Sequence, residues 1–300
     1  MRKRKLRFTH YVLSSMPSIQ KLAVIGDPIA HSLSPVLQSF LIRHFALPFT
    51  YEALHVRAHD LPKMMQRLRN GEFRGLNVTI PHKQAVLPFL DVVDETAAHL
   101  GAANTIAVEK NKLIGYNTDV TGFLRGLTAA GISPSDKNVL VLGAGGAARA
   151  VIFALLKTGA QKIFLCNRSA GRAEALLAAF ANDNRLKSVQ WPDRLSWLQN
   201  NKINVVINAT SMGMHPQLNQ APLPPAAFFP YMIAFDLIYN PLETAFLRDA
   251  AEAGAKTANG LGMLIEQGVA ALEIWSQRKF DIRDIYANLE NELRQALKAS

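Results

Sequence analysis

The sequence NVLVLGAGGAA, residues 138–148, decides the fold of this 300-residue chain. Its first five residues are mostly branched and apolar, which predicts a strand buried in a parallel sheet. The next six have the spacing G-x-G-x-x-A, an apolar helix follows at 149–157, and a second apolar strand follows at 162–166. In such a β-α-β unit the glycines let the backbone approach a pyrophosphate at the helix N-terminus. The stretch therefore predicts a dinucleotide-binding sheet.

The residues after the second strand indicate which dinucleotide is preferred. An acidic side chain at this place would bind the 2′-hydroxyl of NAD, but the chain has Asn167, Arg168 and Ser169 there, and Arg172 one turn later. Two guanidinium groups and a hydroxyl suit a 2′-phosphate. The sequence therefore predicts NADP. An exposed basic helix start without a ligand is the competing interpretation.

The sequence NVTIPHK, residues 77–83, is the second informative stretch. Its alternation predicts a strand at 77–80, and Pro81 favours a helix start, with the helix over 82–90. Lys83 would then lie just past the carboxyl end of a strand, where α/β sheets form ligand crevices. With Asn77 and Thr79 beside it, Lys83 is a candidate functional group, although a lone lysine is more often simply solvated.

The first third of the chain alternates strands and helices, which predicts parallel strands joined by helical crossovers. The helix at 34–45 begins at Ser34-Pro35, a sequence with the form of an N-cap followed by proline. Ser32 has no such structural explanation. The hydroxyls of Ser32 and Ser34 can both donate to a carboxylate, and the nearby helix N-terminus favours an anion there. The other predicted elements are strands at 21–26 and 50–56, helices at 60–69 and 94–100, and a hairpin of 104–108 with 113–117.

The hairpin delivers Asp119 to a predicted loop, after which the dinucleotide sheet begins. Strands at 204–208 and 232–236 extend that sheet, and the proline-rich segment 216–230 between them is predicted to be a surface excursion. A helix at 263–278 has an ordinary apolar face that includes Gln267, whose amide needs partners or a ligand.

Composition supports a globular chain without a membrane span. It is 49% hydrophobic and 19% charged, and no apolar run approaches the roughly 18 residues of a membrane helix. The net charge is +10, but five positive charges lie in the first seven residues, so residues 1–17 are predicted to be a disordered basic extension. The rest of the chain is only mildly basic. This charge is compatible with an anionic small-molecule ligand and does not by itself indicate nucleic-acid binding. Cys166, the only cysteine, excludes an internal disulfide and indicates a cytoplasmic protein.

Taken together, these motifs resemble the shikimate dehydrogenase family over nearly all of the chain from Lys21. They are SLSP at 32–35, NVTIPHK at 77–83, GAANT at 101–105, NTD at 117–119, GAGGA at 143–147, NRS at 167–169, Asp236 with YNP at 239–241, and GLGM at 260–263 with Gln267. The resemblance implies reversible NADPH-dependent reduction of 3-dehydroshikimate to shikimate, in chorismate and aromatic amino-acid biosynthesis. It also implies an α/β fold with two domains. A substrate domain with a mostly parallel sheet would cover 18–120 and be completed by 261–300, and a Rossmann-like NADP domain would cover 121–260.

The resemblance also assigns roles to individual residues. Lys83 resembles the catalytic lysine and Asp119 its paired carboxylate. The implied substrate residues are Ser32, Ser34 and Tyr239 for a carboxylate, Thr79, Asn104, Asp119 and Gln267 for the ring hydroxyls, and Asn77 as a further substrate contact. The implied cofactor residues are Glu95, Gly143, Ala144, Gly145, Gly146, Ala147, Asn167, Arg168, Ser169, Arg172, Leu237 and Gly260. No metal site is expected, and the flanking His31 and His82 are expected to be structural.

Two other functions remain open. One is a quinate/shikimate dehydrogenase with relaxed cofactor use, against which Arg168 and Arg172 argue. The other is a catalytically silent dinucleotide-sensing regulator, which would be expected to lose Lys83 or Asp119; the chain keeps both. The expected partner is a small-molecule substrate, without nucleic acid or membrane, and the expected assembly is a monomer or homodimer.

Overall fold

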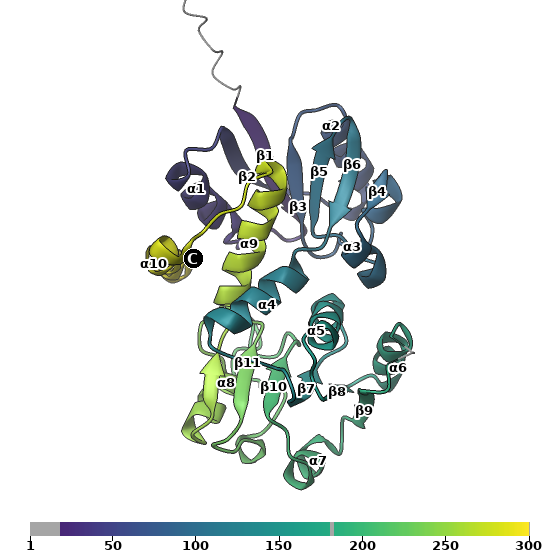
Figure 1. Ribbon diagram of the computed structural model, residues 1–300, viewed down its shortest axis with the longest axis vertical. Coiled ribbons are helices and arrows are strands. Elements are labelled where there is room, and N and C mark those ends of the chain that lie inside the picture. Colours follow the sequence, from purple (N-terminus) through teal and green to yellow (C-terminus); the bar gives the residue numbers. More distant parts are fainter. Residues whose placement is uncertain (1–18, 181–182, 300) are drawn as a thin grey trace, which may run out of the picture.

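The computed structural model describes residues 19–180 and 183–299, so the extension predicted for 1–17 lies outside the described residues. Two six-stranded sheets form the two ends of the molecule (Figure 1). Helices α4 (Asp119–Ala129) and α9 (Leu261–Ser276) lie between the sheets and pack against each other. The chain passes from the first sheet to the second through α4 and returns through α9.

The first sheet has the strand order β2-β1-β3-β5-β6-β4. β1 pairs in parallel with β2 and β3, and β4 pairs in parallel with β6, whereas β5 is antiparallel to both β3 and β6. The sheet is thus mostly parallel, and the predicted hairpin is confirmed as β5–β6. The six strands are β1 (Gln20–Gly26), β2 (Phe49–His55), β3 (Gly75–Val78), β4 (Val92–Val93), β5 (Thr105–Glu109) and β6 (Lys112–Tyr116).

Helices cover both faces of the first sheet. One face packs against α1 (Ser34–His44) and α9, with α10 (Tyr286–Ala299) packed on α1, and the other against α2 (Leu61–Arg69) and α3 (Glu95–Leu100). Short 3-10 turns at η1 (Ala58–Asp60) and η4 (Arg283–Ile285) precede α2 and α10. Trp275 of α9 donates to Ile106 O at 3.0 Å, directly over Gly75, where a Cβ atom would lie 2.1 Å from the indole nitrogen. Gly75 therefore allows α9 to lie on the sheet.

The second sheet is entirely parallel, with the strand order β12-β11-β10-β7-β8-β9. The order reverses between β7 and β10, which is the switch point at which Rossmann sheets bind dinucleotides. The strands are β7 (Asn138–Leu142), β8 (Lys162–Asn167), β9 (Leu186–Gln190), β10 (Val205–Asn208), β11 (Ile233–Asp236) and β12 (Lys256–Ala258). The β-α-β unit that the sequence predicted is therefore confirmed as β7-α5-β8.

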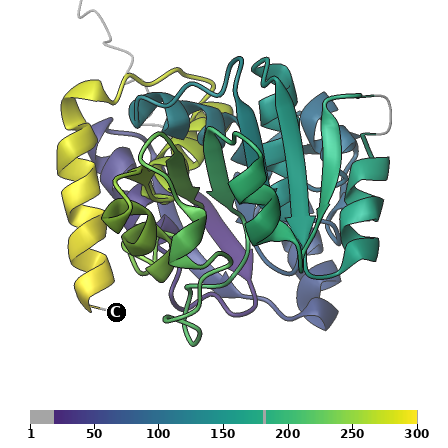
Figure 2. The same ribbon diagram turned by 90° about the horizontal axis from the view of Figure 1, so that it is seen from below.

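Helices also cover both faces of this second sheet. α4, α5 (Gly146–Lys157) and α6 (Ala170–Ala178) pack on one face, and α7 (Arg194–Asn200) and α8 (Ala245–Glu252) on the other. Seen from below, α6 stands at one edge of the molecule and α10 at the opposite edge (Figure 2). Because both faces of the sheet are covered, a ligand is expected at the carboxyl ends of its strands.

Three predicted elements differ from the structure. Residues 82–90 form a run of turns and a 3-10 helix, η2 (Leu87–Phe89), instead of a helix, because Pro88 cannot donate a hydrogen bond and disfavours helical geometry at the preceding residue. The loop predicted after Asp119 is α4. The segment 216–230 is not a surface excursion throughout, because Leu223 and Phe228, which flank η3 (Pro225–Ala227), are buried against the second sheet.

Glycines explain why α4 was missed. Gly122 and Gly126 weaken the helical pattern in the sequence, but here they allow α4 and α9 to touch at backbone distance. A Cβ atom on Gly122 would lie 2.5 Å from Gln267 Cβ, and one on Gly126 would lie 2.9 Å from Met263 N. The two crossing helices can therefore touch only because Gly122 and Gly126 have no side chains.

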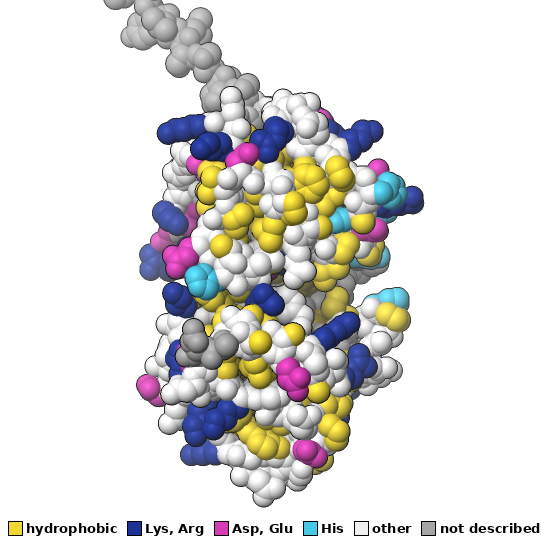
Figure 3. All heavy atoms as spheres, turned by 90° about the vertical axis from the view of Figure 1, so that its right-hand side faces the viewer, with side chains coloured by type: hydrophobic (Ala, Val, Ile, Leu, Met, Phe, Trp, Pro, Cys, Tyr) yellow, Lys and Arg dark blue, Asp and Glu magenta, His cyan; other side chains and the backbone are white. Residues whose placement is uncertain are grey.

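The surface carries mixed charge. On the face shown in Figure 3, Lys and Arg side chains are spread over both lobes, with acidic side chains between them.

Every helix in the described part of the chain is too short or too polar to cross a lipid bilayer.

Gly126→Ala tests the α4–α9 contact. The added methyl group meets the backbone of Met263, which cannot move aside as a side chain can, so we expect a loss of about 1–3 kcal/mol in the free energy of unfolding. The control is Gly171→Ala in α6, where a Cβ atom would meet nothing within 4 Å and should stabilise by about 0.4–1 kcal/mol. Urea denaturation of both variants measures the difference, and equal stabilities would contradict the close packing.

Candidate active site

Lys83 and Asp119 form a close ion pair at the end of the first sheet. Lys83 Nζ donates to Asp119 Oδ2 at 2.5 Å. Lys83 belongs to the run of turns after β3, and Asp119 is the first residue of α4, where the helix N-terminus favours a carboxylate. The Lys83 side chain is 27% exposed and that of Asp119 is 12% exposed. The amine is therefore the more accessible partner for a substrate atom.

The segment that carries Lys83 is held by neighbours on both sides. His82 is buried, with Nε2 at 2.6 Å from Val56 O, so that nitrogen carries a proton and donates. The amide of Ala103 donates to Lys83 O at 2.8 Å. These contacts fix the backbone from which the Lys83 side chain projects, as expected of a structural His82.

Asn104 connects the ion pair to the sheet. Its Nδ2 donates to Asp119 Oδ1 at 2.8 Å, and its Oδ1 accepts from the amide of Thr118 at 2.7 Å and from Thr105 Oγ1 at 3.1 Å. Asn77 in turn donates from Nδ2 to Thr105 Oγ1 at 3.1 Å. Asn77, Asn104 and Asp119 are all nearly inaccessible to solvent. The predicted residues are thus brought together, with the two asparagines already engaged in holding Asp119.

The start of α1 differs from the prediction. Ser34 is the first residue of α1 and does not cap it, because no side chain accepts a hydrogen bond at the N-cap position, Leu33. Instead, Ser32 Oγ accepts from the amide of Ser34 at 3.3 Å. The predicted capping role of Ser34 is therefore wrong. Ser32 supports the helix start. Burial raises the pKa of the nearby Tyr51, and Ser34 partly opposes that rise.

The remaining substrate candidates have side-chain groups without partners among the described residues. The Thr79 amide donates to Ile25 O at 2.9 Å, but no hydrogen bond of the described residues uses its hydroxyl. The same holds for the hydroxyl of Tyr239, and burial raises its pKa, so it remains a donor at neutral pH. Gln267 donates to Leu264 O at 2.9 Å, which leaves its carbonyl oxygen for another donor.

The glycine turn leaves the N-terminus of α5 open. Gly143 has a φ of +108°, and a Cβ atom there would lie 2.8 Å from Ala209 O, so only glycine suits this position. Cβ atoms on Gly145 and Gly146 would meet nothing within 4 Å, and Ala147 is also exposed. Ala144 is partly buried against the core. The free N–H groups at the start of α5 thus face open space, where a pyrophosphate fits.

The residues after β8 lie at the same edge of the sheet as this turn, because β7 and β8 are parallel neighbours. Asn167 Nδ2 donates to Ser169 O at 2.9 Å, and Ser169 Oγ accepts from the Arg172 amide at 3.4 Å and caps α6. Arg168 and Arg172 are exposed, and neither guanidinium group takes part in an ion pair among the described residues. Both are free to bind an anion.

Three further cofactor candidates lie around the second sheet and α3. Leu237 follows β11, and a Cβ atom on Gly260 would lie 2.0 Å from Leu237 O, so the two are in backbone contact. Glu95 is exposed in the first turn of α3, and its carboxylate contacts none of the described residues of the glycine turn. No group of three or more His, Cys, Asp or Glu side chains in the described ranges is arranged to hold a metal ion.

Asp236, at the end of β11, is a buried carboxyl group next to Leu237. It accepts from Thr244 Oγ1 at 2.7 Å, from the Ile238 amide at 3.0 Å and from Asn208 Nδ2 at 3.1 Å. Burial raises the pKa of Asp236 to about 6, and these hydrogen bonds only partly oppose the rise. Its structural role is to join the ends of β10 and β11.

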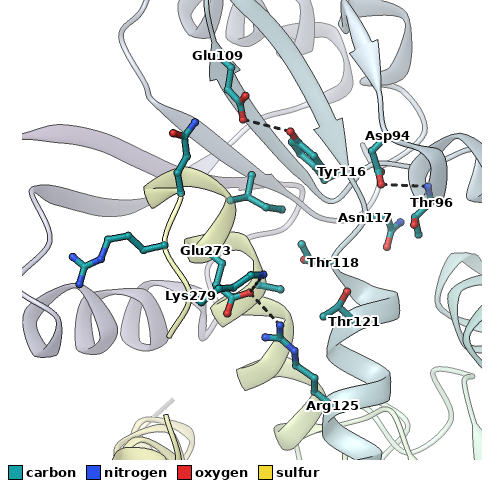
Figure 4. Close-up of a pocket in the computed structure, with 14 residues that line it drawn as sticks. Asp94, Thr96, Glu109, Tyr116, Asn117, Thr118, Thr121, Arg125, Glu273 and Lys279 are labelled. Carbon is teal, nitrogen blue, oxygen red and sulfur yellow. Dashed lines mark hydrogen bonds and ion pairs between the residues drawn. The ribbon is translucent and has the colours of Figure 1, made fainter. Parts of the chain in front are cut away.

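A cavity of about 480 Å³ lies beside α4 and α9 (Figure 4). Thr121 and Arg125 line it, and at two and six residues from Asp119 they project from the opposite side of α4. Arg125 donates to Glu273 of α9 at 3.1 Å in the cavity wall. Lys83 and Asp119 do not line the cavity. The cavity reaches the polar network of the candidate active site at Asn117 and Thr118, but not the ion pair itself.

Sequence reasoning missed Tyr51, Thr105 and Thr118, whose hydroxyls contribute to the polar network. Thr105 and Thr118 lie inside the motifs at 101–105 and 117–119 and could have been found there. Tyr51 belongs to no motif. Only its position in a predicted strand, next in the sheet to β1, was available as a signal.

These features define a class of α/β protein: a Rossmann sheet with an open glycine turn, joined by two crossing helices to a sheet that carries a lysine–aspartate pair. Residues 24–106 match the family described as the shikimate dehydrogenase substrate binding domain. Residues 128–226 match shikimate / quinate 5-dehydrogenase, and 260–290 match the shikimate 5'-dehydrogenase C-terminal domain. The chain belongs to the shikimate dehydrogenase family.

Individual relatives support the assignment over most of the chain. The NADP(+) shikimate dehydrogenase of Moorella thermoacetica is 42% identical over 281 residues, covering 93% of this chain and 94% of that protein. The Thermus thermophilus enzyme, solved with NADP(H) and shikimate, is 38% identical with a TM-score of 0.82, covering 92% and 99% of the two chains. The Listeria monocytogenes enzyme, solved with shikimate and NAD, is 30% identical with a TM-score of 0.84, covering 96% and 100%.

Asp236→Asn tests the buried carboxyl group through pH. Between about pH 4 and 6 the folded protein keeps a proton on Asp236 that the unfolded chain has released, so this group's contribution to stability falls as the pH rises through that window. Asparagine does not titrate. We therefore expect the stability of the wild type relative to the variant to fall by up to about 3 kcal/mol between pH 4 and 7. Denaturant unfolding at both pH values checks this, and a constant difference would contradict it.

Proposed function

We propose that the chain catalyses the reversible NADPH-dependent reduction of 3-dehydroshikimate to shikimate in aromatic amino-acid biosynthesis. The observation that carries the proposal is the Lys83–Asp119 pair, in which a partly exposed amine is held 2.5 Å from a carboxylate that a buried asparagine orients. Two shikimate dehydrogenases that are 42% and 38% identical to this chain, over more than nine-tenths of its length, support the same reaction.

The proposed chemistry needs a proton at one oxygen atom. NADPH, when bound, supplies a hydride to the carbonyl carbon of the substrate. The negative charge that develops on the carbonyl oxygen is neutralised by a proton from Lys83 Nζ. Asp119 holds the amine in place by accepting from it through Oδ2, while Asn104 holds Oδ1. In the reverse direction Lys83 accepts the proton from the substrate hydroxyl.

The proposed substrate contacts separate into two groups. The hydroxyls of Ser32, Ser34 and Tyr239 bind the carboxylate, helped by the N-terminus of α1. The ring hydroxyls are bound by Thr79, Asn104, Asp119 and Gln267, with Asn77 as a further substrate contact. Of these, Thr79 and Gln267 have oxygen atoms that no described residue uses, and they are the most readily available.

The proposed cofactor contacts begin at the open N-terminus of α5. The turn from Gly143 to Ala147 binds the pyrophosphate through backbone N–H groups, since no side chain fills the space next to Gly145 and Gly146. Asn167, Arg168, Ser169 and Arg172 bind the 2′-phosphate. Leu237 and Gly260 contact the nicotinamide end, and Glu95 contributes from α3.

We also propose the division into domains that the resemblance implies. A substrate domain of 18–120 is completed by 261–300, and a cofactor domain covers 121–260. Each of these parts contains one complete sheet, which supports the division. We propose that the enzyme is a cytoplasmic monomer or homodimer with small-molecule partners only. The single buried thiol of Cys166 agrees with a reducing compartment.

The second candidate function is a dehydrogenase that also oxidises quinate and uses NAD. The specific observation in its favour is that the Listeria monocytogenes relative was solved with NAD. Following the absorbance of the reduced cofactor with shikimate or quinate, each with NADP or NAD, separates the candidates. The proposal expects efficient turnover only for shikimate with NADP. Comparable rates with quinate or NAD would favour the second candidate, and no turnover in any combination would favour a silent regulator.

Lys83→Ala removes the proposed proton donor. Because general acid catalysis contributes typically 10²–10⁴-fold, we expect the turnover number to fall by at least about 100-fold. The dissociation constant of NADPH should change little, since Lys83 is not among the proposed cofactor contacts. Lys63→Ala, an exposed lysine on α2, is the control and should leave turnover unchanged. Near wild-type turnover in Lys83→Ala would remove the lysine from the mechanism.

Arg168→Ala combined with Arg172→Ala tests cofactor selectivity. Both arginines lack partners among the described residues, so they are available to a 2′-phosphate that NAD does not have. We expect the KM for NADP to rise by about 10- to 100-fold per lost charged hydrogen bond and the KM for NAD to stay nearly constant. Arg248→Ala, exposed on α8, is the control. An equal loss for both cofactors would assign the arginines to the fold.

A further inference from the structure

Asn117 lies between β6 and α4, and both polar groups of its side chain bind the backbone. Its Oδ1 accepts from the amide of Asp119 at 3.1 Å, and its Nδ2 donates to Ala102 O at 2.9 Å. A backbone amide can only donate and a carbonyl oxygen can only accept, so these two partners fix which way the side-chain amide is turned. Asn117 is only 7% exposed. Its side chain is therefore held at both polar ends.

The peptide group between Ala102 and Ala103 continues this contact to Lys83. Its carbonyl oxygen accepts from Asn117, and its N–H donates to Lys83 O at 2.8 Å. This peptide bond is trans, so its carbonyl and its N–H point in opposite directions from one planar unit. Asn117 and the Lys83 backbone therefore lie on opposite sides of a rigid group. Ala102 and Ala103 are both buried, so water does not readily replace either hydrogen bond.

Two amide groups in series thus join the backbones of the two residues of the ion pair. The order is the Asp119 amide, the Asn117 side chain, the peptide group 102–103 and the Lys83 carbonyl. Every hydrogen bond in this series runs in the same direction, from an N–H to the next oxygen. Each amide that accepts at its oxygen becomes a better donor at its nitrogen, so the bonds strengthen one another.

Asn117 acts differently from Asn104. Asn104 donates to the Asp119 carboxylate and so orients the charged group itself. Asn117 holds the first backbone amide of α4, where the N-cap residue, Thr118, makes no side-chain hydrogen bond to the helix. It therefore takes the place of a cap and fixes where Asp119 enters the helix.

We propose that Asn117 is a positioning residue that sets the separation between Lys83 and Asp119. The inference deepens the proposed function and rests on it, because proton transfer needs the amine and the carboxylate in one fixed geometry. Loss of the Asn117 side chain leaves both charged groups present but lets their backbones move apart. Asn117 lines the cavity beside α4 and α9, so water there can satisfy the freed backbone groups without fixing their position (Figure 4).

Two substitutions at Asn117 test the inference. Asn117→Ala removes both hydrogen bonds, whereas Asn117→Ser keeps an oxygen that can accept from the amide two residues later and loses only the donor to Ala102. Because a misplacement of about 1 Å can cost 100-fold in rate, kcat for shikimate oxidation should fall by about 10- to 100-fold in Asn117→Ala and by less in Asn117→Ser. The KM for NADP should change little, since Asn117 is not among the proposed cofactor contacts.

The control variant is Asn138→Ala at the start of β7. Its side chain likewise donates to a backbone carbonyl, Lys202 O at 3.0 Å, but at the opposite end of β7 from the glycine turn. This variant should leave kcat and both KM values unchanged.

A double variant separates positioning of the ion pair from a general loss of structure. If Asn117 acts through the pair, it has little left to position once Lys83 is removed. The kcat of Lys83→Ala/Asn117→Ala should therefore be within about twofold of that of Lys83→Ala alone. A purely structural role would lower kcat by the same factor in both backgrounds.

The outcomes are distinct. A wild-type kcat in Asn117→Ala, or losses that multiply in the double variant, would overturn the inference. If Asn117→Ala does not fold, Asn117→Ser replaces it in both comparisons. If the wild type itself does not oxidise shikimate, the proposed function fails instead, and the crystal structure of the Asn117 variant decides. A distance from Lys83 Nζ to Asp119 Oδ2 that stays at 2.5 Å would overturn the inference, and a longer one would support it.

Discussion

The ion pair between Lys83 and Asp119 is the interaction on which the rest of the site depends, because it joins two different elements of the fold. Lys83 is fixed by the turns after β3, whereas Asp119 begins the helix that leads to the second sheet. The distance between them therefore depends on where α4 lies, and α4 packs on α9. Gly122 and Gly126 allow that contact at backbone distance. The packing of α4 on α9 thus contributes to the position of Asp119 relative to Lys83.

The polar chain that holds Asp119 explains how a carboxylate can be nearly buried and still be useful. Both of its oxygens accept hydrogen bonds, one from Lys83 and one from Asn104. Burying these charged and polar side chains would be costly without partners. Because the partners are themselves fixed by β3, β5 and α4, the chain leaves few alternative arrangements. Rigid positioning of the proposed proton donor follows, while Thr79, Tyr239 and Gln267 have side-chain groups that no described residue uses.

The sequence predicted the dinucleotide sheet well because a buried parallel strand and a glycine turn are local patterns, and residues 138–167 contain both. It also placed Lys83 and Asp119 in one site, through motifs far apart in the chain. It failed where tertiary contacts override local preference. The glycines of α4 appeared unsuitable for a helix until α9 packed against them, and Pro88 outweighed the helical spacing of 82–90. Ser34 looked like a cap, yet Ser32 accepts the helix amide. Tyr51 had no local signal because its partner, Asn77, comes from β3.

The central claim is that Lys83 and Asp119 act as one unit in proton transfer. A double-mutant cycle on kcat, with Lys83→Ala, Asp119→Asn and the double variant, tests this most directly. If the carboxylate acts only by orienting the amine, the double variant should be about as slow as Lys83→Ala alone, because groups that act together give non-additive losses. Losses that multiply in the double variant would show that the two residues act independently, and would contradict the account.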